Sequence, residues 1–359
     1  MRLKIIAPQE LNAKVSLPPS KSIQSRLLML QALSGKALTP LPGSCTDIQV
    51  LSQALSSEEK TINVKDSGTA LRFLTAYFAT KNSEHVITGS ERLCQRPVKP
   101  LVDALRQLGA CVEYLGEEGY APLKVRGGKL RGGRVEIDAS ESSQYISALM
   151  LISPFVDGGI EIVQTGKKVS SPYIDMTAAI LNSLNSSSSL NSLNYEGDWT
   201  AASYWHEMMI LSGGKVEFTN LNPTSCQGDV IVPELFRRIQ EDADFQFDFT
   251  DNPDLFPAVA ATCFALKKTF HYTGVSNLRI KESDRVATIN AELGKIRRGE
   301  LVVSSHNDHR IAMALAPLAF LLPHIIIDGA EATEKSYPHF WLDLQSAGFL
   351  ITTILPSDH

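Results

Sequence analysis

Apolar positions recur at helical spacing in some stretches and alternate with polar positions in others, and the two patterns follow one another along the chain. The clearest series begins with a predicted helix over Val98–Leu108, which the following glycine ends. Strand-like runs over Cys111–Leu115 and Leu123–Arg126 flank a glycine-containing turn and predict a hairpin. A further strand, Val135–Ile137, leads through a serine-rich turn into a helix around Tyr145–Leu149. This alternation predicts an α/β or α+β fold.

The same order of strand, polar turn and Ala/Leu-rich helix recurs elsewhere. Residues 66–72, 196–202 and 307–312 each open a helix with a turn that contains Ser, Gly or Asp. A first strand is expected at the N-terminus, ending before Pro8. We interpret the recurrence as an internal repeat that has diverged in sequence.

The predicted repeats differ in length. The stretch from Gly109 to Ser140 holds a hairpin and another strand, but the matching stretches after Leu55, Leu184 and Ile239, and that after residue 293, are much shorter. Each of these four has room for about one strand. The second includes the low-complexity segment 184–191, which is typical of a flexible tether. The predicted repeat is therefore uneven.

Length and composition narrow the class of protein. The chain has 359 residues, enough for two domains, and no apolar run approaches the roughly 20 residues that span a bilayer. The N-terminal apolar stretch is too short for a signal peptide. The cysteines are odd in number and form no CxxC pair, which favours neither a disulfide framework nor a zinc site and indicates the cytoplasm: Cys45, Cys94, Cys111, Cys226 and Cys263.

The net charge of −5 argues against a general nucleic-acid binder. It leaves room for an anion site, because basic residues can gather in one cleft while acidic residues cover the outside.

One such site is indicated where Pro19 and Ser20 lead into an apolar helix. Lys21, Ser22 and Arg26 lie at its start, where free backbone N–H groups and the helix dipole favour an anion. An ammonium, a hydroxyl and a guanidinium together suit a phosphate or a carboxylate. The alternative is a basic, capped surface helix.

Further polar residues occupy the corners between predicted strands and helices, which converge on one crevice in layered α/β folds. The cations are Arg96, Arg285, Arg310 and Lys335, each of which alone could be a solvated surface charge. The uncharged groups are Ser142, Ser143, Gln144 and Ser170, whose alternative role is helix capping.

Two carboxylates lie near these cations in the sequence. Asp254 precedes an apolar helix and could simply cap it, and Glu282 lies between Lys281 and Arg285 and could form a plain ion pair. A pair of carboxylates among cations is also what acid–base chemistry on an anionic substrate uses.

Taken together, these segments resemble the EPSP synthase family, the 3-phosphoshikimate 1-carboxyvinyltransferases. Any one motif is weak evidence, but the ordered set covers the chain from its first strand nearly to its C-terminus. The motifs are PSKSIQSR, DSGTALR, QRPVKPLVDAL, SSQYISAL, SSPYIDMT, EGDWTAASYW, QGD, NPD, NLRIKESDR, NDHRIAMALA and EKSYPHFW.

The resemblance implies transfer of the enolpyruvyl group of phosphoenolpyruvate to the 5-hydroxyl of shikimate 3-phosphate, with release of phosphate and with no metal or organic cofactor. It implies two similar domains of βαβαββ units, an inside-out α/β barrel. These are an N-terminal domain at 16–198, on the shikimate 3-phosphate side, and a C-terminal domain at 1–15 plus 199–359, with the active site in the cleft between them. Small-molecule substrates are the expected partners of a monomer, without nucleic acid or membrane.

The resemblance also implies a role for each matching residue. Asp254 would take the proton from the attacking hydroxyl, Glu282 would exchange a proton with the methylene carbon, and Lys21 would join them in catalysis. The residues expected to hold phosphoenolpyruvate are Lys21, Gly68, Arg96, Gln144, Arg285, Arg310 and Lys335. Those expected to hold shikimate 3-phosphate are Ser22, Arg26, Ser142, Ser143, Gln144, Ser170, Asp254, Asn277 and Lys281.

The chain departs from typical members in being shorter. The missing length falls at the four short stretches, where family units carry a hairpin, so several repeat units are expected to be trimmed. The chain also carries Cys94 before Arg96, where many relatives have a charged residue. Cys94 invites comparison with the UDP-N-acetylglucosamine enolpyruvyl transferases, which use a loop cysteine. Ser22 and Arg26 oppose that alternative, because the sister family has asparagine after its first-motif lysine. A non-catalytic protein that binds phosphorylated metabolites is a third alternative, but it would not need both Asp254 and Glu282. Many members of the family are sensitive to glyphosate, and we expect this chain to be a glyphosate target.

Overall fold

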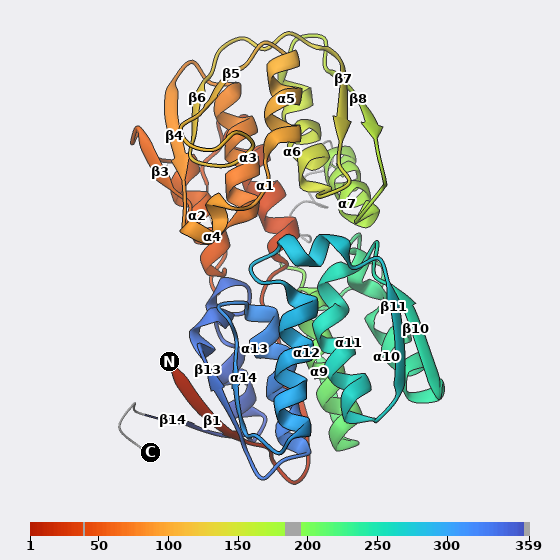
Figure 1. Cartoon of the computed structure of the whole chain (residues 1–359). Coiled ribbons are helices and arrows are strands. Elements are labelled where there is room, and N and C mark those ends of the chain that lie inside the picture. The colour runs from red at the N-terminus through yellow and green to blue at the C-terminus, as the bar shows by residue number, and fades with distance from the viewer. Residues whose placement is uncertain (39, 184–194, 355–359) are drawn as a thin grey trace. The chain divides into compact units, whose positions relative to one another are not determined.

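The computed structural model describes residues 1–38, 40–183 and 195–354 (Figure 1). The chain divides into two compact units: unit 1 comprises Met1–Ser20 and Glu196–His359, and unit 2 comprises Lys21–Tyr195. The expected low-complexity tether at 184–191 lies outside the described residues.

Unit 2 contains one complete βαβαββ repeat. Strands β3 and β4 are parallel, and β6 runs antiparallel to both β4 and β5, which gives a sheet in the order β3-β4-β6-β5. The predicted helix and hairpin of this region are confirmed within a residue or two of their bounds. The elements are β3 (Thr61–Asn63), α3 (Gly68–Ala79), β4 (Glu84–Thr88), α4 (Glu91–Cys94), α5 (Lys99–Gln107), β5 (Cys111–Tyr114) and β6 (Leu123–Arg126).

The other repeats of unit 2 are reduced. One has a single parallel strand pair and its helices, namely β7 (Gly133–Asp138), α6 (Gln144–Ile152), β8 (Ile160–Thr165) and α7 (Ser171–Asn182), with a short 3-10 helix at Ser153–Phe155. The other, within the described residues, consists of helices only, α1 (Lys21–Leu33) and α2 (Thr46–Leu55). Both keep the helices that carry the predicted site residues.

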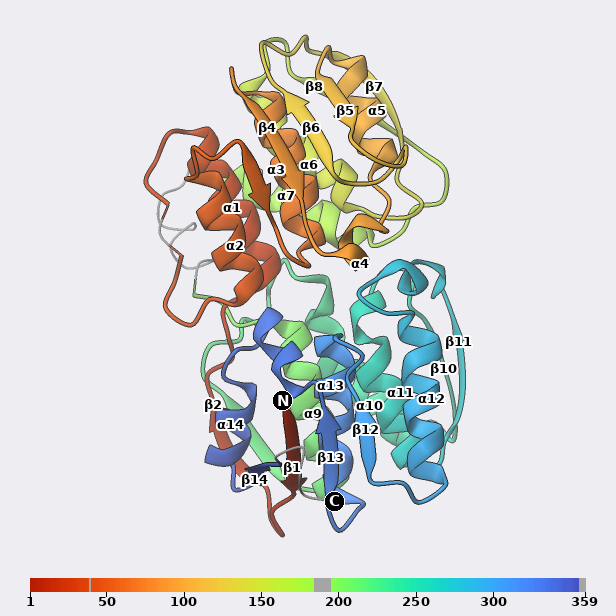
Figure 2. The same cartoon turned by 60° about the vertical axis from the view of Figure 1, so that its left-hand side comes forward.

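Unit 1 also contains a complete repeat, and the first strand of the chain completes it. The sheet order is β12-β13-β1-β14, in which β1 is antiparallel to both neighbours, as β6 is in unit 2 (Figure 2). The N-terminal strand therefore belongs with the last elements of the chain. The elements are β1 (Arg2–Ile6), β12 (Val302–Ser304), α13 (His309–Leu315), β13 (Ile325–Asp328), α14 (Phe340–Ser346) and β14 (Leu350–Thr353).

Two reduced repeats complete unit 1. Each has a parallel strand pair, β2 with β9 and β10 with β11. The expectation of one strand in each short stretch is confirmed after Leu55, Ile239 and residue 293, where β3, β10 and β12 stand alone between helices. The elements are β2 (Asn12–Val15), α9 (Trp199–Ser212), β9 (Lys215–Phe218), α10 (Val232–Glu241), β10 (Asp244–Asp248), α11 (Phe256–Ala265), β11 (Thr269–Thr273) and α12 (Arg285–Arg297).

In each of two parallel strand pairs, a glycine follows the second strand and lets its turn pack closely against the turn that follows the first strand. Gly274 follows β11 at φ +72°, and a Cβ there would lie 2.1 Å from Oδ1 of Asp248, which closes the turn after β10. Gly166 follows β8 at φ +74° in the same way, 2.4 Å from Oδ1 of Asp138. Only glycine fits such a left-handed, crowded position. Adjacent helix starts are thereby held side by side.

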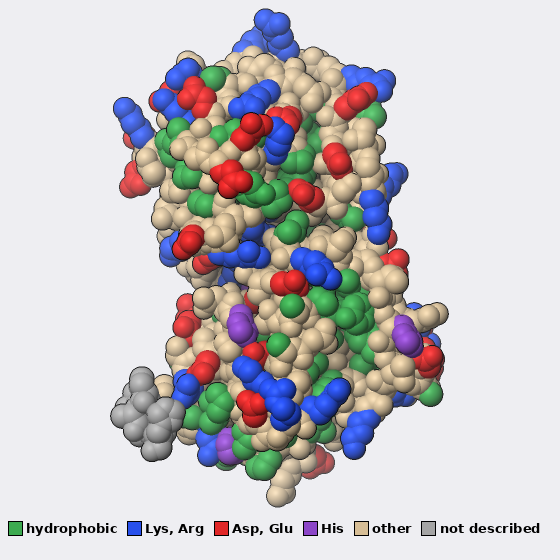
Figure 3. All heavy atoms as spheres, viewed as in Figure 1, with side chains coloured by type: hydrophobic (Ala, Val, Ile, Leu, Met, Phe, Trp, Pro, Cys, Tyr) green, Lys and Arg blue, Asp and Glu red, His purple; other side chains and the backbone are tan. Residues whose placement is uncertain are grey.

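The unit boundary lies a few residues inside the expected 16–198. Backbone hydrogen bonds join the two crossing segments to each other within unit 1: Ser20 N donates to Glu196 O at 2.8 Å, and Asp198 N donates to Pro18 O at 3.0 Å. Basic and acidic side chains are interspersed over the face of each unit that Figure 3 shows. This distribution does not form the continuous basic stripe typical of nucleic-acid binding on that face.

Candidate functional site

The predicted site residues fall into two sets, one in each unit. Unit 2 holds Lys21, Ser22, Arg26, Gly68, Arg96, Ser142, Ser143, Gln144 and Ser170. Unit 1 holds Asp254, Asn277, Lys281, Glu282, Arg285, Arg310 and Lys335.

In unit 2, the buried Arg72 donates hydrogen bonds to two predicted site residues, Gly68 and Gln144, and to Pro97, which follows the predicted Arg96. Its Nη1 donates to Gln144 Oε1 at 2.9 Å and to Gly68 O at 3.2 Å, and its Nη2 donates to Pro97 O at 3.0 Å. A Cβ on Gly68 would lie 2.7 Å from Arg96 Nη1, so the Arg96 guanidinium lies directly over this glycine. Gly68, Arg96 and Gln144 are therefore brought together.

Arg26 joins the starts of three helices. Its guanidinium donates to Thr177 Oγ1 at 2.7 Å, to Ser147 Oγ at 3.1 Å and to the carbonyls of Ser22 and Tyr173 at 2.8 and 2.9 Å. Because these partners come from α1, α6 and α7, the N-terminal turns of these helices converge. Converging N-termini give the positive backbone environment that an anion needs.

The remaining members of this set lie at helix starts. Lys21 forms a largely buried ion pair with Asp47 at 3.1 Å. Ser143 is the N-cap residue of α6, but no side-chain capping hydrogen bond is formed there, while Ser142 Oγ accepts from Gln144 N at 3.3 Å. The capping alternative thus holds for Ser142 and not for the Ser143 hydroxyl.

Ser170 has an unusual backbone conformation. It is buried and precedes α7 at φ +53° and ψ +40°, the left-handed region that non-glycine residues seldom adopt, and its hydroxyl makes no capping bond. Strain of this kind persists where the surrounding structure enforces it.

In unit 1, Asp254 lies among cations rather than at a cap. Its Oδ1 accepts from Arg285 Nη1 at 2.8 Å, its Oδ2 accepts from Arg310 Nη2 at 2.7 Å, and Lys281 Nζ lies 3.8 Å from Oδ1. The cap positions beside it belong to Asn252 and Leu255. The capping alternative for Asp254 is therefore wrong.

Glu282 bridges two of the predicted cations. Its Oε2 accepts from Arg285 Nη2 at 2.8 Å, and its Oε1 pairs with Lys335 Nζ at 2.7 Å. The ion-pair alternative is thus confirmed for Arg285, and the pair extends to Lys335. Burial lowers the pKa of Arg285, but the carboxylates of Asp308, Glu282 and Asp254 outweigh it, so the net shift is upward.

Sequence reasoning missed two charged residues that organise these sets, Arg72 and Asp308. Asp308 is fully buried, caps α13 by accepting from Arg310 N at 3.0 Å, and accepts from Arg285 Nε at 2.8 Å. Both residues stand inside motifs used for the family resemblance, DSGTALR and NDHRIAMALA. An aspartate directly before a helix that begins with His-Arg was the available signal for Asp308.

Asn277 lies at the start of the 3-10 helix Ser276–Ile280 and is buried. Its Oδ1 has no hydrogen-bond partner within the described ranges. A buried acceptor without a partner is costly unless a ligand satisfies it. This observation fits the expected contact of Asn277 with a substrate.

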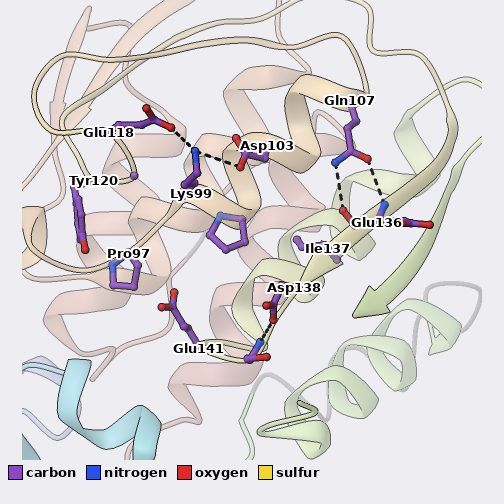
Figure 4. Close-up of a pocket in the computed structure, with 13 residues that line it drawn as sticks. Pro97, Lys99, Asp103, Gln107, Glu118, Tyr120, Glu136, Ile137, Asp138 and Glu141 are labelled. Atoms are coloured by element: carbon purple, nitrogen blue, oxygen red, sulfur yellow. Dashed lines mark hydrogen bonds and ion pairs between the residues drawn. The ribbon is translucent and has the colours of Figure 1, made fainter. Parts of the chain in front are cut away.

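A cavity of about 660 Å³ in unit 2 contains none of the predicted residues (Figure 4). It lies beside α5 and β7, and Lys99 within it pairs with Glu118 and Asp103. Most charges on its wall are negative: Asp103, Glu118, Glu136, Asp138 and Glu141. An acidic wall is unsuited to a phosphorylated, carboxylated ligand, so we do not assign this cavity to the substrates.

Comparison with known proteins identifies the family. The family model of EPSP synthase (3-phosphoshikimate 1-carboxyvinyltransferase) matches residues 41–344. A 3-phosphoshikimate 1-carboxyvinyltransferase of Bacteroides fragilis (strain YCH46) is 36% identical over 403 residues, covering 97% of this chain and 98% of the relative. The chain belongs to the EPSP synthase family.

More distant members agree. A 3-phosphoshikimate 1-carboxyvinyltransferase of Methanoculleus marisnigri is 29% identical over 423 residues, covering 98% of this chain and all of the relative. The EPSP synthase of Acinetobacter baumannii has the same fold, with a TM-score of 0.71 at 17% identity over 98% of this chain and 100% of that chain. Since the alignments are longer than the 359 residues here, these EPSP synthases contain several dozen residues without a counterpart in this chain.

Two further observations concern absent features. Among the described residues, no group of three or more His, Cys, Asp or Glu side chains could hold a metal ion. No helix in the described part of this EPSP synthase family member is long and apolar enough to cross a membrane.

Proposed function

We propose that this chain is a 3-phosphoshikimate 1-carboxyvinyltransferase, which moves the enolpyruvyl group of phosphoenolpyruvate to the 5-hydroxyl of shikimate 3-phosphate and releases phosphate on the route to chorismate. The observation that carries the proposal is the pairing of two carboxylates with the same group of cations in unit 1, in a member of this family. Asp254 and Glu282 share Arg285, and each has a further cation of its own.

The two carboxylates supply the acid–base chemistry. As the 5-hydroxyl oxygen bonds to C2 of phosphoenolpyruvate, its proton passes to Asp254, and C3 receives a proton from Glu282. Glu282 then recovers a proton from C3 as the bond from C2 to the phosphate oxygen breaks. The proton held by Asp254 leaves with the phosphate, which restores both carboxyl groups to their starting states. The net change is an ether in place of a phosphate ester, with no oxidation.

The cations offset the charge of the substrates. Two phosphates and the carboxylates bring about −5 to −6 near neutral pH. Like charges about 5 Å apart repel by roughly 3 kcal/mol at an effective dielectric constant near 20. We assign phosphoenolpyruvate to Lys21, Gly68, Arg96, Gln144, Arg285, Arg310 and Lys335. We assign shikimate 3-phosphate to Ser22, Arg26, Ser142, Ser143, Gln144, Ser170, Asp254, Asn277 and Lys281. Both sets act on the same pair of substrates.

The enzyme is further proposed to work as a cytoplasmic monomer on free metabolites. Scattered cysteines without a disulfide pattern support a reducing compartment.

Phosphate release in the presence of both substrates tests the proposal, with Asp254→Asn as the decisive variant. Asparagine keeps the shape and removes the base, so turnover should fall by about two to four decades, the usual contribution of one acid–base group. Asp251→Asn, an exposed acid three residues earlier, is the matched control and should retain turnover.

The outcomes separate the alternatives. Turnover with UDP-N-acetylglucosamine in place of shikimate 3-phosphate would identify the sister activity. Binding of both substrates without phosphate release would identify a non-catalytic protein. Turnover of Asp254→Asn at the wild-type rate would show that Asp254 is not the base.

A further inference from the structure

Asp229 is a buried carboxylate close enough to Asp254 to interact with it electrostatically, and it has no assigned role in the reaction. It belongs to the 3-10 helix Gly228–Ile231, and only 3% of its surface is exposed. Within the described residues, both of its side-chain hydrogen bonds come from neutral groups: Thr200 Oγ1 donates at 2.5 Å and Asn252 Nδ2 at 3.0 Å. An ionised carboxylate without a neighbouring ammonium or guanidinium donor is expensive to bury.

The hydrogen bond to Asn252 connects Asp229 to the turn that carries Asp254. Asn252 is itself buried, and its Nδ2 also donates to Gly228 O at 3.0 Å. Asn252 is the N-cap of the single-turn 3-10 helix Pro253–Leu255, so Asp254 follows it by two residues. A clamp on Asn252 therefore sets the position of the Asp254 carboxylate.

The charge of Asp229 also reaches Asp254. Burial raises the pKa of Asp229 to about 6, and the nearby Asp254 carboxylate adds to this rise, while the hydrogen bonds and Arg310 oppose it. By the same interaction, ionised Asp229 increases the proton affinity of Asp254. Among the described residues, the charged or titratable groups that face this pair include Lys281, Arg285 and Arg310, and Tyr204 of α9.

A neutral side chain at position 229 could also have hydrogen-bonded to Asn252 and Thr200, without the cost of burying an acid. We propose that Asp229 is a positioning residue for Asp254: it holds the catalytic turn through Asn252, and its negative charge makes Asp254 a stronger base. The inference rests on the proposed role of Asp254.

Asp229→Asn separates charge from position. A flipped asparagine can accept from Asn252 through its oxygen and donate to Thr200 through its nitrogen, so the hydrogen bonds survive while the charge is lost. The ratio of kcat for the wild type to kcat for this variant should be near 1 at pH 5, where Asp229 is protonated. It should rise to about threefold or more by pH 7.5, since a stronger base transfers the proton more readily. KM for both substrates should not change.

Asp229→Ala and Asn252→Ala test the positional part. Both should lower kcat by about tenfold or more even at pH 5, because an unclamped base loses its alignment, while KM for phosphoenolpyruvate changes little. Asn220→Ala is the matched control: its amide braces Leu17 in the same unit through two backbone hydrogen bonds, at 3.0 and 2.8 Å, so its loss should lower stability and not kcat.

The result that would overturn the inference is a kcat ratio for Asp229→Asn that stays constant from pH 5 to pH 7.5, with Asn252→Ala at the wild-type kcat. Other results would show that the proposed function itself is wrong. In that case the wild type would release no phosphate, or Asp254→Asn would be fully active. If the alanine variants do not fold, the isosteric Asp229→Asn still decides the charge effect.

Discussion

Gly68→Ala should weaken every ligand that occupies the phosphoenolpyruvate site. The added methyl would lie 2.7 Å from Arg96 Nη1 and 2.9 Å from Arg96 Cζ, and 2.8 Å from Arg72 Nη1. Ordinary contact starts near 3.4 Å, so both guanidinium groups must move by several tenths of an ångström. Arg72 cannot move freely, because it holds Gln144 and the Pro97 carbonyl. The strain therefore falls on the two residues that we assign to the ligand, Arg96 and Gln144.

The magnitude follows from the cost of overpacking, about 1–3 kcal/mol. Since 1.4 kcal/mol is a factor of ten, KM for phosphoenolpyruvate should rise by roughly tenfold. Inhibition by glyphosate, which we expect to compete with phosphoenolpyruvate, should weaken by roughly tenfold or more. KM for shikimate 3-phosphate should change little. Gly68 is the first residue of α3, where alanine is no worse a helix former, so the losses cannot be ascribed to helix propensity.

The assay is phosphate release against phosphoenolpyruvate at saturating shikimate 3-phosphate, repeated with glyphosate at fixed shikimate 3-phosphate. Gly128→Ala is the matched control in the same unit, because a Cβ there would have no heavy atom within 4 Å. The reasoning is refuted if Gly68→Ala leaves both KM for phosphoenolpyruvate and glyphosate inhibition unchanged. Wild-type insensitivity to glyphosate would equally contradict the placement of Gly68 beside the ligand.

Two other variants test features of stability. Glu207 is fully buried, neither carboxylate oxygen has a hydrogen-bond partner within the described ranges, and burial raises its pKa well above the usual value. Because the folded state holds this proton more tightly than the unfolded state, stability should fall by up to about 1.4 kcal/mol per pH unit above about pH 4.5. Urea unfolding from pH 4.5 to 8 should show that the free energy of unfolding of Glu207→Gln exceeds that of the wild type by an amount that grows as the pH rises. A difference that stays constant over this range would rule this out. Ser170→Gly should be about 1 kcal/mol more stable than Ser170→Ala, since glycine removes the strain at φ +53° and alanine keeps it. Both should raise KM for shikimate 3-phosphate equally, and equal urea midpoints would show that the site is unstrained.

Hydrophobic periodicity and turn residues predicted those helices and strands whose bounds depend on nearby residues. The helix expected over Val98–Leu108 is Lys99–Gln107, and the hairpin after it has the expected strands, because a proline precedes the helix and glycines lie after the helix and around the hairpin. The insertion of β1 between β13 and β14 could not be read from periodicity, since pairing across more than 300 residues depends on the finished sheet. Only the family resemblance assigned residues 1–15 to the C-terminal domain.

The same holds for the candidate site: the sequence predicted which residues belong to it, but not how they contact one another. Residue types at predicted strand–helix corners indicated both the cations and the two carboxylates, and the family resemblance added the role of each. The connections among them are tertiary: nothing in the local sequence says that Arg285 reaches Asp308, or that Arg72 turns inward to Gln144. The capping role considered for Asp254 failed for the same reason, because the capping position is set by the backbone of the finished turn.

The trimmed repeats show which part of this fold the chemistry needs. The reduced repeat of β10 and β11 supplies Asp254, Glu282 and Arg285, and the reduced repeat of β7 and β8 supplies Gln144 and Ser170, whereas a complete repeat supplies Gly68 and Arg96. Complete and reduced repeats thus present equivalent corners. Those corners are closed by the turn after the first strand and the glycine after the second, as at Gly274 against Asp248. The antiparallel hairpin extends a sheet beyond this pair of strands and contributes none of the assigned residues. Losing it removes buried area from the sheet while the helix starts that hold the charges stay in place.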